Sequence, residues 1–177
     1  SALWRLRESG FRVVPVTGRP AGWCDLIARE WPVDGVVGEN GAFAFFLEDG
    51  HMRQLFHPRA VKSEPGGILD AVKRRSLAEV PGSRVAKDQF GRMFDLAIDF
   101  AEEEPVLGLE AAQAIRDIAV SEGAQAKISS IHVNAWLGDY DKLAMSELFL
   151  SSRFAWDPIM EAASVMFFGD SPNDEPM

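Results

Sequence analysis

The chain has 177 residues, and 18 lysines plus arginines against 27 aspartates plus glutamates give it a formal net charge of −9. Hydrophobic residues make up 47% of the chain and charged residues 25%, which is typical of a folded protein and too apolar for a disordered acidic segment. The acidic balance disfavours a general nucleic-acid-binding protein, because affinity for the phosphate backbone requires clustered lysine and arginine. A small anion, held by a few local donors, is not excluded.

The lone cysteine, Cys24, cannot form a disulfide within the chain, and we expect it to be a buried thiol. No apolar run approaches the length that crosses a bilayer, and no signal peptide opens the sequence. We therefore expect a cytoplasmic protein without a membrane partner. The sequence does not predict an oligomeric state.

The first forty residues alternate between helix and strand signals. Leu3–Glu8 predicts the end of a helix that stops at Gly10, and Phe11–Val16 predicts a short strand. Ala21–Trp31 predicts a helix after Pro20, and residues 34–38 predict a second, buried strand. This alternation is typical of a parallel sheet with crossover helices.

The middle of the chain predicts a different, α+β architecture. Asp49-Gly50 separates two β-rich runs, which indicates a hairpin. Helical spacing follows from Ile68 and again from Leu109, and strands are predicted at Phe94–Phe100 and Lys127–Trp136.

The first pattern returns near the end, with a helix over Asp141–Leu150 and an apolar strand over Ser164–Phe168. We therefore expect an α/β fold in which a Rossmann-like core with a parallel sheet, residues 1–41 and 137–177, is interrupted by an inserted α+β domain, residues 42–136.

Three short segments carry residue types suited to phosphate chemistry. Thr17-Gly18-Arg19 follows an apolar strand, where a hydroxyl and nearby backbone N–H groups can hold a phosphate oxygen. The segment from Gly169 to Asp174 follows another apolar strand, and the oxygens of Asp170, Asn173 and Asp174 suit Mg²⁺. Lys142 begins a predicted helix.

Each segment also has an ordinary structural interpretation. Thr17-Gly18-Arg19 alone is more typical of a turn that ends a strand, and a single lysine such as Lys142 is usually a solvated surface residue. The acidic segment could simply cap a helix, because serine and aspartate are favoured there.

Taken together and in this order, Thr17, Lys142 and Gly-Asp-x-x-Asn-Asp resemble the second, third and fourth motifs of the haloacid dehalogenase (HAD) superfamily. The insertion resembles the large α+β cap of that superfamily, with Glu39-Asn40-Gly41 as its exit from the core and Asp141-Lys142-Leu143 as its return. Within the superfamily the chain is most similar to phosphatases of sucrose phosphate, trehalose phosphate or mannosyl-3-phosphoglycerate.

The resemblance implies a Mg²⁺-dependent phosphatase that hydrolyses a small phosphorylated metabolite, such as a sugar phosphate, through a phosphoaspartate. Thr17 and Lys142 would be catalytic, and Asp170, Asn173 and Asp174 would hold the metal. The first motif of the superfamily, Asp-x-Asp-x-Thr, supplies the nucleophile and is absent from residues 1–177. We therefore expect that both ends of the core are missing from this sequence.

The resemblance also suggests residues that bind substrate. Gly18 and Arg19 lie beside Thr17, Asn40 lies at the exit to the insertion, and His132 and Asn134 share the polar face of a predicted cap strand. Structural roles for Arg19, Asn40, His132 and Asn134 remain equally open. We expect Asp95 and Asp99 to lie on a solvated face and the acidic run at residues 101–105 to be a solvated loop.

Two other functions remain open. A phosphomutase shares this kind of core and cap, and would return the phosphoryl group to the sugar. A non-catalytic α/β binding module without a nucleophile is the alternative from another class, and a flavodoxin-like fold would not explain so large an insertion.

Overall fold

The computed structural model describes residues 2–169, and the chain divides into two compact units within this range. Unit 1 consists of the residues up to Pro58 together with Tyr140–Phe168, and unit 2 consists of Arg59–Asp139. None of the described helices has the length and apolar character needed to span a bilayer.

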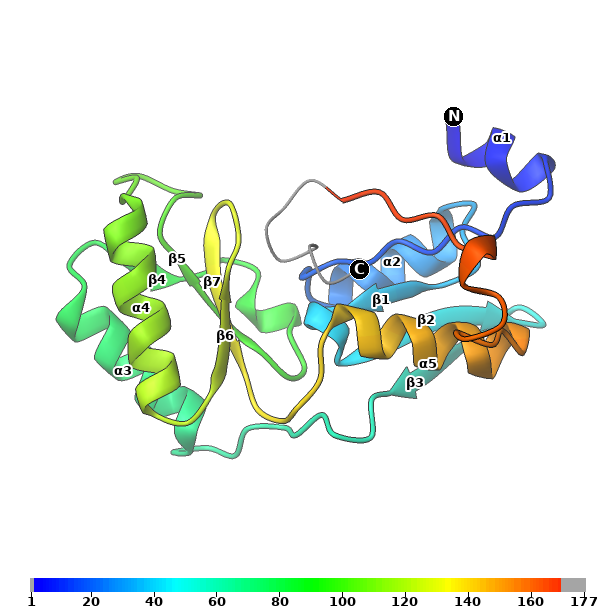
Figure 1. The fold of residues 1–177 in the computed structure, drawn as a ribbon. Helices are drawn as coiled ribbons and strands as arrows, with labels where there is room; N and C mark the ends of the chain where they lie inside the picture. Colours follow the sequence, from blue (N-terminus) through cyan, green and yellow to red (C-terminus); the bar gives the residue numbers. More distant parts are fainter. Residues whose placement is uncertain (1, 170–177) are drawn as a thin grey trace. The chain divides into compact units, whose positions relative to one another are not determined.

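Unit 1 contains a three-stranded antiparallel sheet in the order β1-β2-β3 (Figure 1). Its elements are α1 (Ala2–Glu8), α2 (Ala21–Glu30), β1 (Val36–Gly38), the short 3₁₀ helix η1 (Glu39–Gly41), β2 (Phe43–Glu48), β3 (His51–Phe56), α5 (Lys142–Phe154) and the 3₁₀ helix η3 (Ala162–Ser164). The predicted Asp49-Gly50 hairpin is confirmed, with both turn residues at positive φ.

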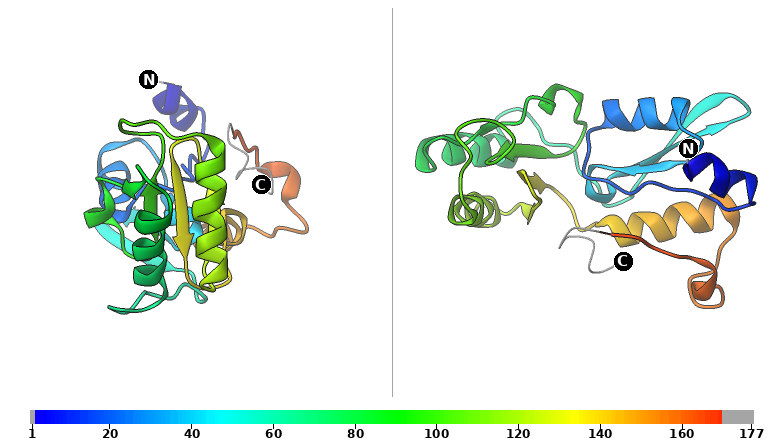
Figure 2. Two further views of the ribbon diagram at one scale, coloured as in Figure 1. Left: turned by 90° about the vertical axis from the view of Figure 1, so that its left-hand side faces the viewer. Right: turned by 90° about the horizontal axis from the view of Figure 1, so that it is seen from above.

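Helices α2 and α5 cover opposite faces of this sheet (Figure 2). The strand period of two places Val37 and Ala44 against Met145 and Phe149 of α5. On the other face Gly38 lies against Cys24 of α2, which confirms the predicted burial of this thiol. The sheet therefore holds the first turns of two helices at fixed positions.

The predicted strand at residues 11–16 is extended chain joined to β1 by a parallel bridge between Val16 and Val37. Within the described residues every assigned pair of strands is antiparallel and this bridge is the parallel contact, so the fold mixes helices and strands but the expected parallel sheet is not seen. The predicted strand Ser164–Phe168 is wrong: Val165–Phe168 are exposed and unassigned. No other described strand pairs with them, and a strand exists only as part of a ladder.

Unit 2 is an α+β unit with an antiparallel sheet in the order β4-β5-β7-β6. Its elements are α3 (Ile68–Glu79), β4 (Arg84–Val85), the 3₁₀ helix η2 (Gln89–Gly91), β5 (Leu96–Asp99), α4 (Leu109–Ser121), β6 (Gln125–Ile128) and β7 (His132–Trp136). Helices α3 and α4 cover one face of the sheet (Figures 1 and 2), and Ile98, Val133 and Ile115 lie in the core between them.

Two predictions from the sequence differ from the observed structure of unit 2. The single strand predicted over Lys127–Trp136 is wrong, because Ser129–Ile131 form a turn between β6 and β7. The insertion expected to begin at residue 42 differs from the division at residues 58 and 59, because the β2–β3 hairpin pairs with β1 in unit 1.

Candidate active site

Three segments that are distant in sequence meet at one edge of the unit 1 sheet: Thr17–Arg19, Glu39–Gly41 and Asp141–Lys142. The backbone N–H of Thr17 donates to the carbonyl of Val37 at 2.9 Å, which continues the pairing with β1. Beyond that strand, Asn40 N–H donates to the Thr17 carbonyl at 3.2 Å. The turn that carries Thr17 and the segment after β1 are therefore bonded to each other.

Two glycines bring these segments closer than side chains would allow. A Cβ atom on Gly18 would lie 3.0 Å from the side-chain oxygen of Asn40. A Cβ atom on Gly41 would lie less than 3.0 Å from the carbonyl oxygen of Asp141 and from the backbone nitrogen of Lys142. The structure thus brings together Thr17, Gly18, Asn40 and Lys142 of the predicted site.

Thr17 is half-buried, and its hydroxyl oxygen accepts the backbone N–H of Arg19 at 3.1 Å. This local bond fixes the turn and the rotamer of Thr17, while the hydroxyl hydrogen is able to donate to an anion. Arg19 is exposed. The sequence-based choice of Thr17 as an anion donor is compatible with this geometry.

Lys142 is the first residue of α5 and is only 8% exposed, so the ordinary expectation of a solvated surface lysine does not apply to it. Asp141 caps the helix by accepting the Ala144 N–H at 2.8 Å, and the Lys142 carbonyl accepts the hydroxyl of Ser146 at 2.8 Å. These bonds hold the backbone of Lys142. A buried ammonium requires anionic or polar groups around it.

The first turns of α2 and α5 both lie at this edge, since the Ala21 N–H donates to the Glu39 carboxylate and the backbone of Lys142 lies against Gly41. Helix N-termini carry partial positive charge that favours anions. Both N-termini already hold a carboxylate, Glu39 at α2 and Asp141 at α5, so Thr17 and Lys142 are the groups of this edge that are suited to binding a phosphate group.

His132 and Asn134, the predicted substrate-binding residues of the insertion, lie in unit 2 on the face of β7 opposite its hydrophobic core. Both are buried. Nε2 of His132 lies 2.8 Å from a carboxylate oxygen of Glu102, and the amide of Asn134 donates to Asp95 at 3.1 Å. Each side chain is therefore already bonded to a carboxylate in its own unit.

The predicted metal ligands Asp170, Asn173 and Asp174 lie outside the described residues. Within residues 2–169, no group of three or more histidine, cysteine, aspartate or glutamate residues is arranged to hold a metal ion. The donor set proposed for Mg²⁺ thus consists of those three residues, whose carboxylate and amide oxygens are the ligand type that Mg²⁺ prefers.

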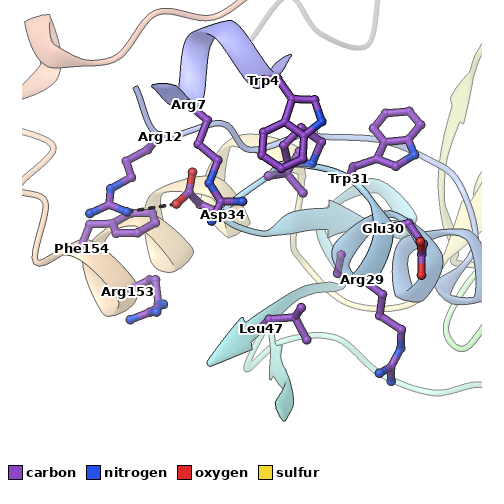
Figure 3. Close-up of a pocket in the computed structure, with 13 residues that line it drawn as sticks. Trp4, Arg7, Arg12, Arg29, Glu30, Trp31, Asp34, Leu47, Arg153 and Phe154 are labelled. Carbon is purple, nitrogen blue, oxygen red and sulfur yellow. Dashed lines mark hydrogen bonds and ion pairs between the residues drawn. The ribbon is translucent and has the colours of Figure 1, made fainter. Parts of the chain in front are cut away.

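A cavity of about 410 Å³ lies elsewhere in unit 1, where α2 and α5 end, and contains none of the predicted site residues (Figure 3). Several arginines line it, but three have carboxylate partners: Arg12 pairs with Asp34, Arg29 with Asp25, and Arg153 with Glu48. Helix C-termini carry partial negative charge, which explains arginines in the last turns of these helices. The cavity is less suited to an anion than the edge where the helices begin.

Sequence reasoning missed the contact that Glu39 makes. Its side chain is fully buried, and its carboxylate accepts the Ala21 N–H at 2.9 Å. The available signal was the absence of a capping side chain before α2, where Pro20 occupies the N-cap. A helix that begins this way needs an acceptor from elsewhere in the chain.

Comparison with protein-family models finds no match, and comparison with curated proteins finds none either. Solved structures do match. A protein from Thermoplasma acidophilum is 18% identical and has a TM-score of 0.72, with 99% of this chain and 69% of that chain covered.

A sugar phosphatase of HAD subclass IIB is 12% identical with a TM-score of 0.61, and the match covers 98% of this chain and 72% of that one. The sucrose-phosphatase of Synechocystis is 14% identical with a TM-score of 0.59, and the match covers 96% of this chain and 66% of that one. These likenesses show that the chain shares the fold of HAD phosphatases and spans about two thirds of the length of such structures.

Proposed function

We propose that this chain is the greater part of a Mg²⁺-dependent phosphatase that hydrolyses a small phosphorylated metabolite, with a sugar phosphate as its substrate class. The observation that supports it most directly is the meeting of Thr17–Arg19, Glu39–Gly41 and Lys142 at one edge of the sheet. Structural neighbours that are sugar phosphatases support the same activity.

In this proposal each residue of the edge has one role. The hydroxyl of Thr17 and the backbone of Gly18 donate to oxygens of the phosphoryl group, and Asn40 and Arg19 orient the substrate. The ammonium of Lys142 stabilises the negative charge that spreads over the phosphoryl oxygens during transfer. Because Lys142 is held in the first turn of a capped helix, it meets the transition state without reorganising.

Asp170, Asn173 and Asp174 would hold Mg²⁺, which when bound supplies neutralising charge at the phosphate. The nucleophile would be the aspartate of the first HAD motif, which residues 1–177 do not contain. We also propose unit 2 as the cap, in which His132 and Asn134, together with their partners Glu102 and Asp95, select the leaving group.

The test is phosphate release from a panel of phosphorylated sugars and glycerates with Mg²⁺, using the complete natural polypeptide. Thr17→Val and Lys142→Ala should each lower kcat by roughly 10²–10³, the usual effect of removing one electrostatic donor. Lys73→Ala, which removes an exposed lysine of α3, is the matched control and should leave kcat unchanged.

Near-normal turnover in Lys142→Ala, with circular dichroism showing a folded protein, would contradict the assignment. Isomerised sugar phosphate without released phosphate would identify a phosphomutase instead.

A further inference from the structure

Glu39 stands out among the residues near the candidate site, because its carboxylate is fully buried and lies at the start of a helix. Oε1 of Glu39 accepts the N–H of Ala21, the first residue of α2, at 2.9 Å. Pro20, at the N-cap, provides no side-chain acceptor. A carboxylate at a helix N-terminus is favoured by the helix dipole, so Glu39 replaces the missing cap across 18 residues of sequence.

Glu39 also begins a run of unusual backbone conformation. Three consecutive residues have positive φ: 43° at Glu39, 57° at Asn40 and 106° at Gly41. Left-handed conformations are disfavoured for residues with a side chain and persist only where the surroundings enforce them. The structure therefore has to hold Glu39 and Asn40 in place.

The contacts that hold them lead directly to the Thr17 turn. The backbone N–H of Glu39 donates to the Arg19 carbonyl at 3.1 Å, and that of Asn40 donates to the Thr17 carbonyl at 3.2 Å. The Glu39 side chain adds a third attachment, to Ala21, directly after this turn. Residues 17–21 and 39–41 thus form one bonded assembly with the Glu39 carboxylate at its centre.

We propose that Glu39 is a positioning residue that couples the start of α2 to the left-handed Glu39–Gly41 segment, and so fixes Thr17 and Asn40 in the geometry required for phosphoryl transfer. The kinetic part of this inference rests on the proposed function. The coupling itself is a property of unit 1 and is measurable without catalysis.

Three variants test the coupling. Glu39→Ala removes the acceptor, and Glu39→Gln retains an amide oxygen at the same reach. Ala21→Pro removes the N–H donor instead. The backbone should accept this proline, because proline is favoured at the first position of a helix. The preceding residue, Pro20, also has the extended ψ of 162° that a following proline requires. Asp70→Ala is the matched control, because Asp70 accepts the Gly66 N–H near the start of α3 in unit 2.

The first measurement is amide hydrogen exchange by NMR in the natural polypeptide. In Glu39→Ala and Ala21→Pro, exchange at Thr17, Glu39 and Asn40 should rise together, whereas Glu39→Gln should stay near the natural protein and Asp70→Ala should match it at these positions. Faster exchange confined to the first turn of α2, with residues 17 and 39–40 unchanged, would overturn the coupling.

The second measurement separates kcat from KM on the best phosphate ester. Glu39→Ala should lower kcat by up to ~10²-fold, the scale expected for misplacement of reacting groups, with a smaller change in KM and with recovery in Glu39→Gln. Increased exchange at residues 17 and 39–40 with an unchanged kcat would overturn the positioning role. If the natural protein releases no phosphate from any ester, the proposed function fails, and the exchange measurement still decides whether Glu39 couples the two segments.

Discussion

Gly41 has no room for a side chain, and this single residue lets the start of α5 approach the end of β1. Its φ of +106° is in the region that side chains disfavour, and a Cβ atom there would overlap the backbone carbonyl of Asp141. Because backbone atoms cannot move aside as a flexible side chain can, the position of Lys142 depends on this glycine.

We expect Gly41→Ala to lower the free energy of unfolding by about 1–2 kcal/mol for the left-handed backbone and by roughly a further 1–3 kcal/mol for overpacking. Urea denaturation measures the sum. Gly123→Ala is the control, because Gly123 has φ +92° with open space around it, so only the backbone penalty applies. If the two variants lose the same free energy of unfolding, the close approach of Gly41 to Asp141 does not exclude a side chain.

The sequence predicts the location of some single residues in the fold but not of others. Thr17 could be chosen because it follows an apolar strand, whereas Lys142 could be chosen only because it falls between Thr17 and the acidic segment in the order of the HAD motifs. Asp95 and Asp99 were predicted on a solvated face, and this was wrong: both are buried and paired with Arg92 and Arg84. The alternation of polar and apolar residues along one strand cannot reveal that a guanidinium from outside the strand covers its polar face. The polar face was therefore predicted to be exposed to solvent.

At the scale of elements, the acidic loop at residues 101–105 is more than the solvated loop that the sequence predicts. Arg84 of β4 donates to the backbone carbonyls of Glu103, Glu104 and Pro105 and to the carboxylate of Asp99. Asp99 also accepts the N–H groups of Ala101 and Glu102, at 2.9 and 2.7 Å. The loop is therefore attached to the sheet by two side chains.

These attachments make the loop sensitive to acid. Burial alone would raise the pKa of Asp99, but the hydrogen bonds from Arg84 and from the backbone of Glu102 and Ala101 outweigh it, and the pKa is lowered. A carboxylate with a lowered pKa in the folded state stabilises the protein fully above the ordinary aspartate value of about 3.9. That contribution is lost as the pH falls through the lowered pKa.

We therefore expect Asp99→Asn to be less stable than the natural protein at neutral pH, with the difference shrinking as the pH falls below about 3.9. Urea denaturation of both proteins across the acid range measures this. Arg84→Met removes the charged partner and keeps an apolar stem. Its difference in stability from the natural protein should likewise shrink as the pH falls. A stability difference for Asp99→Asn that stays constant down to the lowest pH would contradict the account.

Most helices and strands could be predicted, because hydrophobic periodicity and turn residues act locally. The hairpin at Asp49-Gly50 and the helices at residues 21–30 and 109–121 follow such signals. The predictions of two strands were wrong because strand pairing depends on residues outside the predicted segment. Ser129–Ile131 reverse the chain so that β6 pairs with β7, and Val165–Phe168 have a strand-like composition without a described neighbour to pair with.

At the scale of the whole molecule, residues Arg59–Asp139 of unit 2 are one continuous stretch of chain with a hydrophobic core of its own. The core combines both helices with the inner face of the sheet and includes Val72, Ile98, Ile115 and Val133, all fully buried. A continuous segment that buries its own core can fold alone. Unit 1, by contrast, requires two segments that are separated by 81 residues, Arg59–Asp139.

We expect residues 59–139, expressed alone, to fold cooperatively, with dispersed NMR amide signals that match those of the same residues in the whole chain. Ile115→Ala should lower the stability of this fragment by about 2–5 kcal/mol, the usual loss for a large buried aliphatic side chain. Phe149→Ala in the whole chain is the complementary control, because Phe149 lies in the core of unit 1 and should leave the amide signals of unit 2 unchanged. A fragment without cooperative unfolding would show that unit 2 depends on unit 1.

The two ends of unit 2 lie beside each other: Val61 bridges Leu137, and Arg59 forms an ion pair with Asp139 at 2.6 Å. When the first and last residues of an inserted segment lie side by side, the rest of the chain has to accommodate only that narrow junction. A segment of another size with the same junction would therefore fit without a change in the surrounding chain. The same junction gives protein engineers a natural place to graft a foreign domain.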